Sequence, residues 1–250
     1  MFKKDYSSSI SSYTADIMSG LMIIFLFISV SYMLEVGAEK VNAIKEKNRA
    51  EQEKENMRNI AKQFEDIKYS IFYDLSKEFK DDLKQWNAGI DKETLSITFN
   101  EPDVFFNRGE SGLNDNFKKI LDDFFPKYIK LLSNKKYKDY IEEIRIEGHT
   151  SSEWTNENGK LTLESYFKNM ELSQARTRSV LEYVMLLPSL KKYRMFLINK
   201  VTANGLSYSR RIIINGKEDY KKSRRVEFRI KTTAEEHIEK ILNGDKIENN

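Results

Sequence analysis

The feature that most constrains this chain is an uncharged apolar run near its N-terminus. Residues 17–34 read IMSGLMIIFLFISVSYML and contain no charged side chain. About 18 residues of helix, at ~1.5 Å rise per residue, come close to spanning a hydrocarbon core of ~30 Å. No small-x-small cleavage site follows, and a charged helical pattern continues instead. We therefore expect a permanent transmembrane helix over residues 16–35, with a cleaved signal peptide as the main alternative.

The charges on either side of this run predict its orientation. Two lysines precede it, whereas Glu35, Glu39 and Lys40 follow it. Basic residues next to a membrane span favour the cytoplasmic side. We expect residues 1–15 to lie in the cytoplasm and the long C-terminal part to lie on the other side of the membrane.

Charge balance and composition exclude several classes of protein. The chain has 42 Lys and Arg against 39 Asp and Glu, and no basic block stands free of acidic neighbours, so nucleic-acid binding is not expected. There is no Cys, which excludes disulfides and thiolate metal sites and suits an oxidising compartment. No nucleophile constellation, metal set or cofactor loop is evident, so we expect neither an enzyme nor a bound cofactor.

Asp16 stands immediately before the apolar run and allows two interpretations. As a helix N-cap, its carboxylate would accept hydrogen bonds from free backbone N–H groups and face the positive end of the helix dipole. If the helix starts earlier, near Ser8, Asp16 lies inside the apolar zone, where an ionisable side chain is costly and usually marks an ion pathway. The residues alone leave both interpretations open.

The sequence around Asp16 resembles the membrane span of MotB-type stator subunits. Residues 13–22 read YTADIMSGLM, and that family has an aspartate, then Met and a small residue, then a Met-rich apolar helix. The resemblance implies that Asp16 carries a translocated ion, either H⁺ or Na⁺. One helix cannot enclose an aspartate away from lipid. The resemblance therefore also implies a multi-span MotA-like partner, with five copies around a dimer of this chain.

Residues 36–90 predict a helical connector. Its middle part, residues 45–56, has no large apolar side chain and is either a solvated helix or a flexible spacer. Residues 36–44 are a candidate plug helix. Further on, apolar residues recur every three or four positions and form a stripe that either packs on the next domain or joins two copies of the chain, namely Met57, Ile60, Phe64, Ile67, Ile71, Leu75, Phe79 and Leu83.

Residues 91–233 predict a two-layer α/β (α+β) sandwich with helices on one face of a sheet. Helical spacing covers residues 117–132 and 172–187, and residues 191–198 allow one or two more turns. Strand patterns occur at residues 94–99, 144–147, 201–204 and 226–230. The tail, residues 234–250, is either a short docking helix or disordered.

Three motifs in this region resemble, in the same order, those of OmpA-like domains. They read IEGHT at residues 146–150, NMELSQAR at 169–176 and SRRVE at 223–227. The family forms are a strand ending in G-H-T-D, then N-x-x-L-S-x-x-R-A, then N-R-R-V-E. The resemblance implies an OmpA-like domain that binds the peptide stem of peptidoglycan. It also places this domain in the periplasm and the apolar helix in the inner membrane.

The resemblance assigns peptidoglycan-binding roles to six positions, Ser151, Asn169, Leu172, Arg176, Arg224 and Arg225. Asn169, Leu172 and Arg176 lie at i, i+3 and i+7, on one side of a helix. The planar guanidinium of an arginine suits a carboxylate of diaminopimelate. The two adjacent arginines alternate across a strand, so one should face the helix layer or the rim of the site and the other should face solvent.

The chain departs from the family pattern after the G-H-T motif. Ser151 occupies the position of the family aspartate, and Glu153 or Glu157 is a candidate substitute for the missing carboxylate. The sequence contains one other histidine, His237 in the tail, and no pattern of catalytic residues surrounds His149. We therefore expect His149 to be a structural histidine.

Within the MotB-type family, the short N-terminus, the compact length and the loop at residues 151–169 resemble subunits of Zorya anti-phage defence systems more than flagellar ones. The resemblance implies an ion-motive stator subunit that is held to the cell wall. Two alternatives remain open. The chain could serve a flagellar motor, or it could be a plain envelope tether in which Asp16 is only an N-cap and no ion moves.

Overall fold

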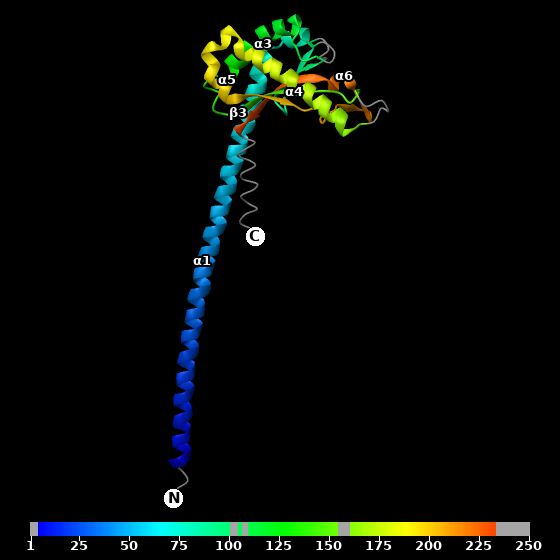
Figure 1. Cartoon of the computed structure of the whole chain (residues 1–250). Helices are drawn as coiled ribbons and strands as arrows, with labels where there is room; N and C mark the ends of the chain where they lie inside the picture. Colours follow the sequence, from blue (N-terminus) through cyan, green and yellow to red (C-terminus); the bar gives the residue numbers. More distant parts are fainter. Residues whose placement is uncertain (1–4, 101–104, 107–109, 155–160, 234–250) are drawn as a thin grey trace. The chain divides into compact units, whose positions relative to one another are not determined.

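The computed structural model describes residues 5–100, 105–106, 110–154 and 161–233, with side chains from residue 13 onward. The chain divides into two compact units, residues 1–60 and residues 61–250. A single helix, α1 (Asp5–Glu78), runs through the first unit and continues into the second (Figure 1). The two units are described separately below.

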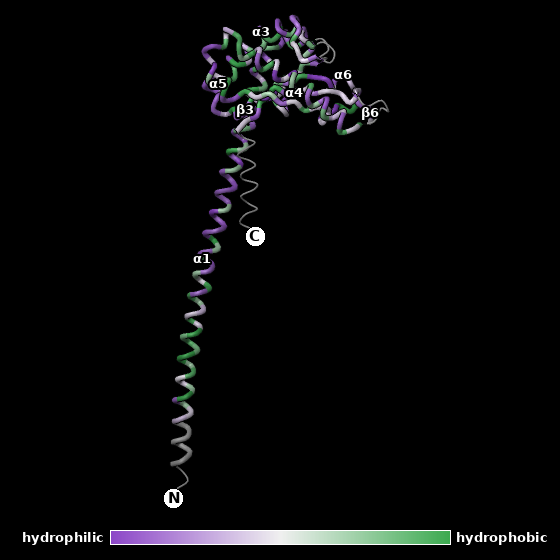
Figure 2. The backbone as a smooth tube through the Cα atoms, viewed as in Figure 1, coloured by the Kyte–Doolittle hydropathy of each residue, from purple (hydrophilic) through white to green (hydrophobic). Residues whose placement is uncertain are grey.

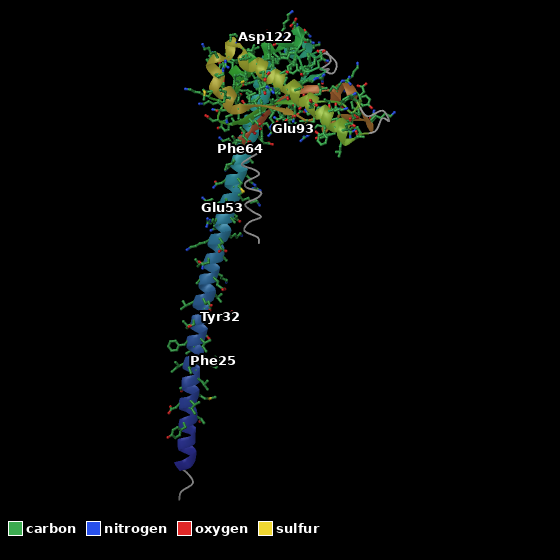
Figure 3. All side chains as sticks on the ribbon, in the orientation of Figure 1. Phe25, Tyr32, Glu53, Phe64, Glu93 and Asp122 are labelled. Carbon is green, nitrogen blue, oxygen red and sulfur yellow. The ribbon has the colours of Figure 1, made fainter. Side chains whose placement is uncertain are left out.

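In the first unit, the apolar run of α1 is exposed along its length. Figure 2 shows this run as a hydrophobic stretch of the helix, and Figure 3 shows Phe25 and Tyr32 projecting away from the helix axis. Their side chains are 66% and 68% exposed. Among the described residues, α1 is the helix that is long and apolar enough to cross a membrane. No other part of the chain that the structure describes covers this surface, which suits a hydrocarbon environment.

The charged middle of α1 is a solvated helix. Residues 45–56 remain helical and exposed, and ion pairs link successive turns, with Arg49 Nε 3.1 Å from Glu53 Oε1 and Lys47 Nζ 4.0 Å from Glu51 Oε1. Such pairs stabilise a helix by only about 0.3–0.5 kcal/mol each. This part is therefore a solvated helix and not a flexible spacer.

In the second unit, the end of α1 packs into the domain that follows. Ile71, Leu75 and Phe79 are fully buried, and the ring of Phe79 lies 5.2 Å from that of Phe124. Side-chain bonds reinforce this packing, because Tyr137 Oη donates to Asp74 at 2.5 Å. The core therefore begins well before residue 91, where the sequence placed the domain boundary. The packing accounts for this part of the apolar stripe.

The described residues of the second unit form a five-stranded mixed sheet and a small two-stranded one. The main sheet has the order β1-β2-β7-β3-β4, in which β3 and β4 are parallel and the other neighbours are antiparallel. The elements after α1 are α2 (Asp82–Gln85), β1 (Ala88–Asp91), β2 (Ser96–Asn100), α3 (Asp115–Leu132), β3 (Ile141–His149), α4 (Leu163–Leu186), η2 (Pro188–Tyr193), α5 (Arg194–Lys200), β4 (Val201–Gly205), β5 (Ile213–Ile214), β6 (Lys217–Glu218), α6 (Tyr220–Ser223) and β7 (Arg225–Thr232).

The central strand β7 separates an apolar face of the sheet from a polar one. Phe228 lies opposite Ile97 on β2 and Ile146 on β3, and its ring packs 4.9 Å from that of Phe124 on α3. Side chains alternate along a strand, so Glu227 points to the other face. The apolar face is covered by α3 and α4 (Figure 1), which confirms the predicted two-layer α/β sandwich.

Helix α4 begins earlier than its sequence pattern predicted. Thr162 caps it, accepting from the Ser165 amide in a capping box. The sequence placed the start near residue 172, because the buried side of the first turns carries polar and small side chains in place of an apolar stripe. These buried residues are Ser165, Asn169, Ser173, Arg176 and Thr177.

Two glycines allow α4 to lie directly on the strand ends. A Cβ atom on Gly205 of β4 would lie 2.3 Å from the backbone nitrogen of Gln174, and one on Gly148 of β3 would lie 2.7 Å from Thr177 Cγ2. A side chain at either position would push the helix away from the sheet. This close approach brings the N-terminal half of α4 next to the segment that leaves β3.

Candidate functional site: a pocket at the end of strand β3

A pocket of about 1020 Å³ lies where residues 110–112, the segment after β3, the N-terminal half of α4 and Arg224, just before β7, meet. Five of the six positions expected to bind peptidoglycan line it, although they are spread over more than 70 positions of the sequence. They are Ser151, Asn169, Leu172, Arg176 and Arg224.

The residues contributed by α4 are held firmly in place. Asn169 is 3% exposed, and its Nδ2 donates to the carbonyl oxygen of Ser165 at 2.9 Å and to that of Trp154 at 3.4 Å. Arg176 is 5% exposed. Its Nε donates to the carbonyl oxygen of Glu110 at 2.9 Å, and its guanidinium carbon lies 4.9 Å from the centre of the Phe106 ring. This bonding fixes the orientation of the guanidinium before any ligand arrives.

The other arginine of the pocket pairs with a carboxylate. Arg224 Nη1 lies 2.5 Å from Glu153 Oε2 and 3.4 Å from Ser151 Oγ. Glu153 was one of two candidate substitutes for the missing family aspartate, and it lies in the pocket with its side chain half exposed. Glu157, the other candidate, lies outside the described residues. The pocket therefore contains a carboxylate even though Ser151 cannot supply one.

Arg225 lies outside the pocket and does not face solvent, contrary to the expectation for one of the two arginines. It is 7% exposed, its Nε donates to Glu227 at 2.5 Å, and its Nη1 donates to the carbonyl oxygens of Arg210 and Ser223, both at 3.1 Å. The segment between β4 and β7 covers this face of the strand. Strand alternation alone could not predict that cover.

Several lining residues were not among the predicted ones. Lys168 lies on the same side of α4 as Leu172, one turn away, and its Nζ lies 5.4 Å from the centre of the Trp154 ring. The helical spacing from Leu172 could have identified it. Thr150 also lines the pocket, and its buried hydroxyl has no hydrogen-bond partner among the described residues. Thr150 is the last residue of the IEGHT motif, so this motif could have identified it.

The charges of the pocket are mixed. Arg176, Arg224 and Lys168 supply positive charge, whereas Glu153 and Glu171 supply negative charge. Such a site can bind a ligand that carries both carboxylate and ammonium groups. The arginine forks suit the carboxylate, and an exposed glutamate suits the ammonium group.

His149 lies just outside this pocket, on the polar face of the sheet. It is 4% exposed, as expected for a structural histidine, but neither ring nitrogen has a hydrogen-bond partner among the described residues. Burial lowers the pKa of His149 to about 3, and the nearby Arg225, Arg210 and Arg229 act in the same direction. The imidazole is therefore neutral at physiological pH.

Asp16 lies inside α1 and is not the cap of this helix. The helix begins at Asp5, several turns earlier, so the backbone N–H groups near Asp16 are already part of the helix. The side chain is exposed at the start of the apolar run, next to Ile17 and Met18, which are also exposed. The N-cap interpretation therefore does not fit this structure, and the ion-carrying role of Asp16 stays a prediction.

The second unit matches a known protein family. Residues 105–221 match the OmpA family. A solved MotB-like protein from Desulfovibrio vulgaris is 19% identical with a TM-score of 0.47, covering 68% of this chain and 94% of that one. The cell wall anchor of the T6SS from Pseudomonas aeruginosa is 20% identical with a TM-score of 0.43, covering 63% and 96%.

A curated relative covers nearly the whole chain. The Zorya protein ZorB of Escherichia coli (strain Crooks) is 41% identical over 241 residues, which is 96% of this chain and 95% of the relative. One apolar helix ahead of an OmpA-family domain fits a single-pass inner-membrane protein with a periplasmic domain. The chain belongs to the ZorB family.

Proposed function

We propose that this chain is the ion-carrying, cell-wall-anchored subunit of a Zorya-type stator complex in anti-phage defence. The observation that carries the proposal is the position of Asp16, inside a helix and at the edge of an exposed apolar run, in a chain that belongs to the ZorB family. The N-terminus lies in the cytoplasm and the OmpA-family domain in the periplasm.

The anchoring part of the proposal rests on the pocket. Its ligand is the peptide stem of peptidoglycan, whose diaminopimelate residue carries both carboxylate and amino groups. Arg176 and Arg224 bind the carboxylates, and Glu153 binds the amino group in place of the family aspartate. The mixed charge and the prearranged guanidinium of Arg176 support these roles.

The ion-carrying part requires a second protein. A carboxylate at the start of a lipid-facing run is costly unless other helices surround it, and α1 alone cannot surround Asp16. A multi-span MotA/ZorA-like partner, five copies around a dimer of this chain, supplies the remaining wall of the pathway. Asp16 then takes up and releases H⁺ or Na⁺.

The ion-carrying role is tested by Asp16→Asn, which removes the charge and keeps the shape. The chain is expressed with a MotA/ZorA-like partner from the same genome, and phage plating and swimming are both measured. Loss of protection with normal swimming supports a defence motor, whereas loss of swimming points to a flagellar one. Glu35→Gln, at the other end of the run, is the control and should keep protection. If Asp16→Asn is inserted and protects normally, the ion-carrying role is wrong and the tethering function remains.

The anchoring role is tested by sedimentation of the full chain in detergent with purified peptidoglycan. Arg176→Lys loses the planar fork, and a lost hydrogen bond to a charged group costs about 1.5–3 kcal/mol, so binding should weaken roughly 10-fold or more. Arg178→Lys is the matched control, because Arg178 lies on the same helix but pairs with Glu182 in solvent. Equal binding by both variants and the unsubstituted chain would contradict the assignment of this pocket.

A further inference from the structure

Three ligand-type side chains converge on the polar face of the sheet, behind the pocket. Glu147 and His149 lie on the same side of β3, and Glu227 on β7 is directly opposite Glu147 in the strand register. His149 Nε2 lies 3.8 Å from Glu147 Oε2 and 3.9 Å from Glu227 Oε2. One nitrogen and two carboxylate oxygens thus lie within 4.8 Å of one another.

The burial of this group leaves its histidine without a partner. His149 and Glu147 are 4% and 5% exposed, and neither imidazole nitrogen has a hydrogen bond among the described residues. Leaving a buried polar group without a hydrogen-bond partner destabilises a fold, and such groups are rare in native proteins. The distances to the two carboxylates are too long for hydrogen bonds but suit ligands on either side of an ion.

We propose that Glu147, His149 and Glu227 bind a divalent transition-metal ion, with Zn²⁺ the best match. Zinc accepts imidazole nitrogen at about 2.0–2.1 Å and carboxylate oxygen at about 2.0–2.2 Å. Ligand atoms around it are then roughly 3.3–3.5 Å apart, so the ligand atoms, which lie within 4.8 Å of one another, need to close in by a few tenths of an ångström to about 1.5 Å.

The charges around the site are compatible with the ion and limit its affinity. Two carboxylates offset the double positive charge, and neutral His149 offers a lone pair. Arg225 bonds to Oε1 of Glu227 and leaves Oε2 facing His149. Arg145, Arg210 and Arg229 lie near Glu147, and their positive charge makes binding weaker than at an all-acidic site.

A metal ion here would join the two central strands next to the pocket. Thr150 and Ser151 directly follow His149, and Arg224 directly precedes β7, on which Glu227 lies. All three of these residues line the pocket. The ion would hold the strand ends that place Ser151 and Arg224, whatever ligand the pocket binds, so this inference does not rest on the proposed function.

The test uses the full chain in detergent, without a polyhistidine tag and stripped with a chelator. Zn²⁺ is titrated by calorimetry, and metal retained after desalting is measured by mass spectrometry. We expect one saturable site per chain and an increase in Tm on adding Zn²⁺, since an ion that binds only the folded state stabilises it. Failure of the wild-type chain to bind Zn²⁺ saturably at one ion per chain overturns the proposal, whatever the variants do.

Paired variants locate the site. Glu147→Gln keeps the shape and removes a ligand, so it should weaken Zn²⁺ binding about tenfold or more, because even outer-shell substitutions cost that much. Glu143→Gln is the control, since Glu143 lies on the same strand and face but is bound to Arg145 and Thr202. It should bind Zn²⁺ within about twofold of wild type. Circular dichroism verifies that both variants fold, and equal binding by a folded Glu147→Gln variant overturns the proposal.

Discussion

Apolar side chains are exposed in the first unit and buried in the domain that follows it. Phe25 and Tyr32 of α1 are mostly exposed, whereas Phe79 and Phe124 of the domain are fully buried. The domain makes its own core, because strands and helices distant in sequence close around it. In the first part of α1, the apolar side chains have no such neighbours among the residues that the structure describes.

The two candidate sites differ in the same way. In the pocket, the side chains of Asn169 and Arg176 are positioned by bonds within the chain. Asp16 is exposed, and no other element that the structure describes surrounds it. The pocket is therefore built within the chain, whereas a partner around Asp16 stays a proposal.

The largest difference in stability between the two regions is expected when an aromatic ring is removed from each. Phe124→Ala should reduce the free energy of unfolding of the domain by about 3–5 kcal/mol, because its ring contacts those of Phe79, Phe99 and Phe228. Phe25→Ala should leave that free energy unchanged. Denaturant unfolding of the full chain in detergent, followed by near-ultraviolet circular dichroism, measures both. A similar loss in the two variants would break the comparison.

A smaller effect on stability is expected when a glycine is replaced by alanine. Gly205→Ala should destabilise the domain by about 1–3 kcal/mol, since its Cβ would meet the backbone of Gln174. Gly37→Ala has open space around it and should be neutral or slightly stabilising, because alanine is the better helix former. Thermal unfolding of both variants tests this. A destabilising effect of Gly37→Ala would indicate that another chain packs there.

The hydroxyl group of Tyr137 helps to attach the end of α1 to the domain, and its removal should have a smaller effect. Tyr137→Phe should cost about 1 kcal/mol at neutral pH, because Tyr137 donates to Asp74 and also bonds to Ser70. The Tyr137 hydrogen bond is the largest influence on Asp74 and lowers the pKa of this carboxyl below 3.8. A lowered folded-state pKa contributes stability above the unfolded value that is lost as the pH falls through the folded one.

The difference between Tyr137→Phe and wild type should therefore shrink as the pH falls below about 4. Denaturant midpoints over a pH series give this difference directly. A difference that stays constant with pH would show that the Asp74 carboxylate does not contribute to it.

The smallest effect is expected in the solvated part of α1. Glu53→Gln removes an exposed pair with Arg49 and should cost no more than about 0.3–0.5 kcal/mol of local helix stability. Stability of the domain should not change. Hydrogen exchange of the amides in residues 45–56, compared with wild type, measures the local effect. A loss of domain stability would show that this segment is coupled to the core.

The sequence alone predicted the elements that depend on short-range patterns of apolar and charged residues. The uncharged run gives the span, because a hydrocarbon core excludes charge over a fixed length. The apolar stripe of residues 117–132 gives α3, because one face must be buried. The three OmpA-like motifs marked Ser151, Asn169, Leu172, Arg176 and Arg224, and these residues do share one pocket. Their binding role stays a prediction.

Other features were decided by tertiary structure, because they depend on which segments meet. The early start of α4 was hidden by its polar buried side, and β1 became a strand through pairing with β2. The segment before β7 buried Arg225, and folding placed Glu153 beside Arg224. Glu227, the second carboxylate next to His149, came close only when β3 and β7 paired. Burial and charge pairing across distant segments follow from the packing of the whole domain, and no local period in the sequence records them.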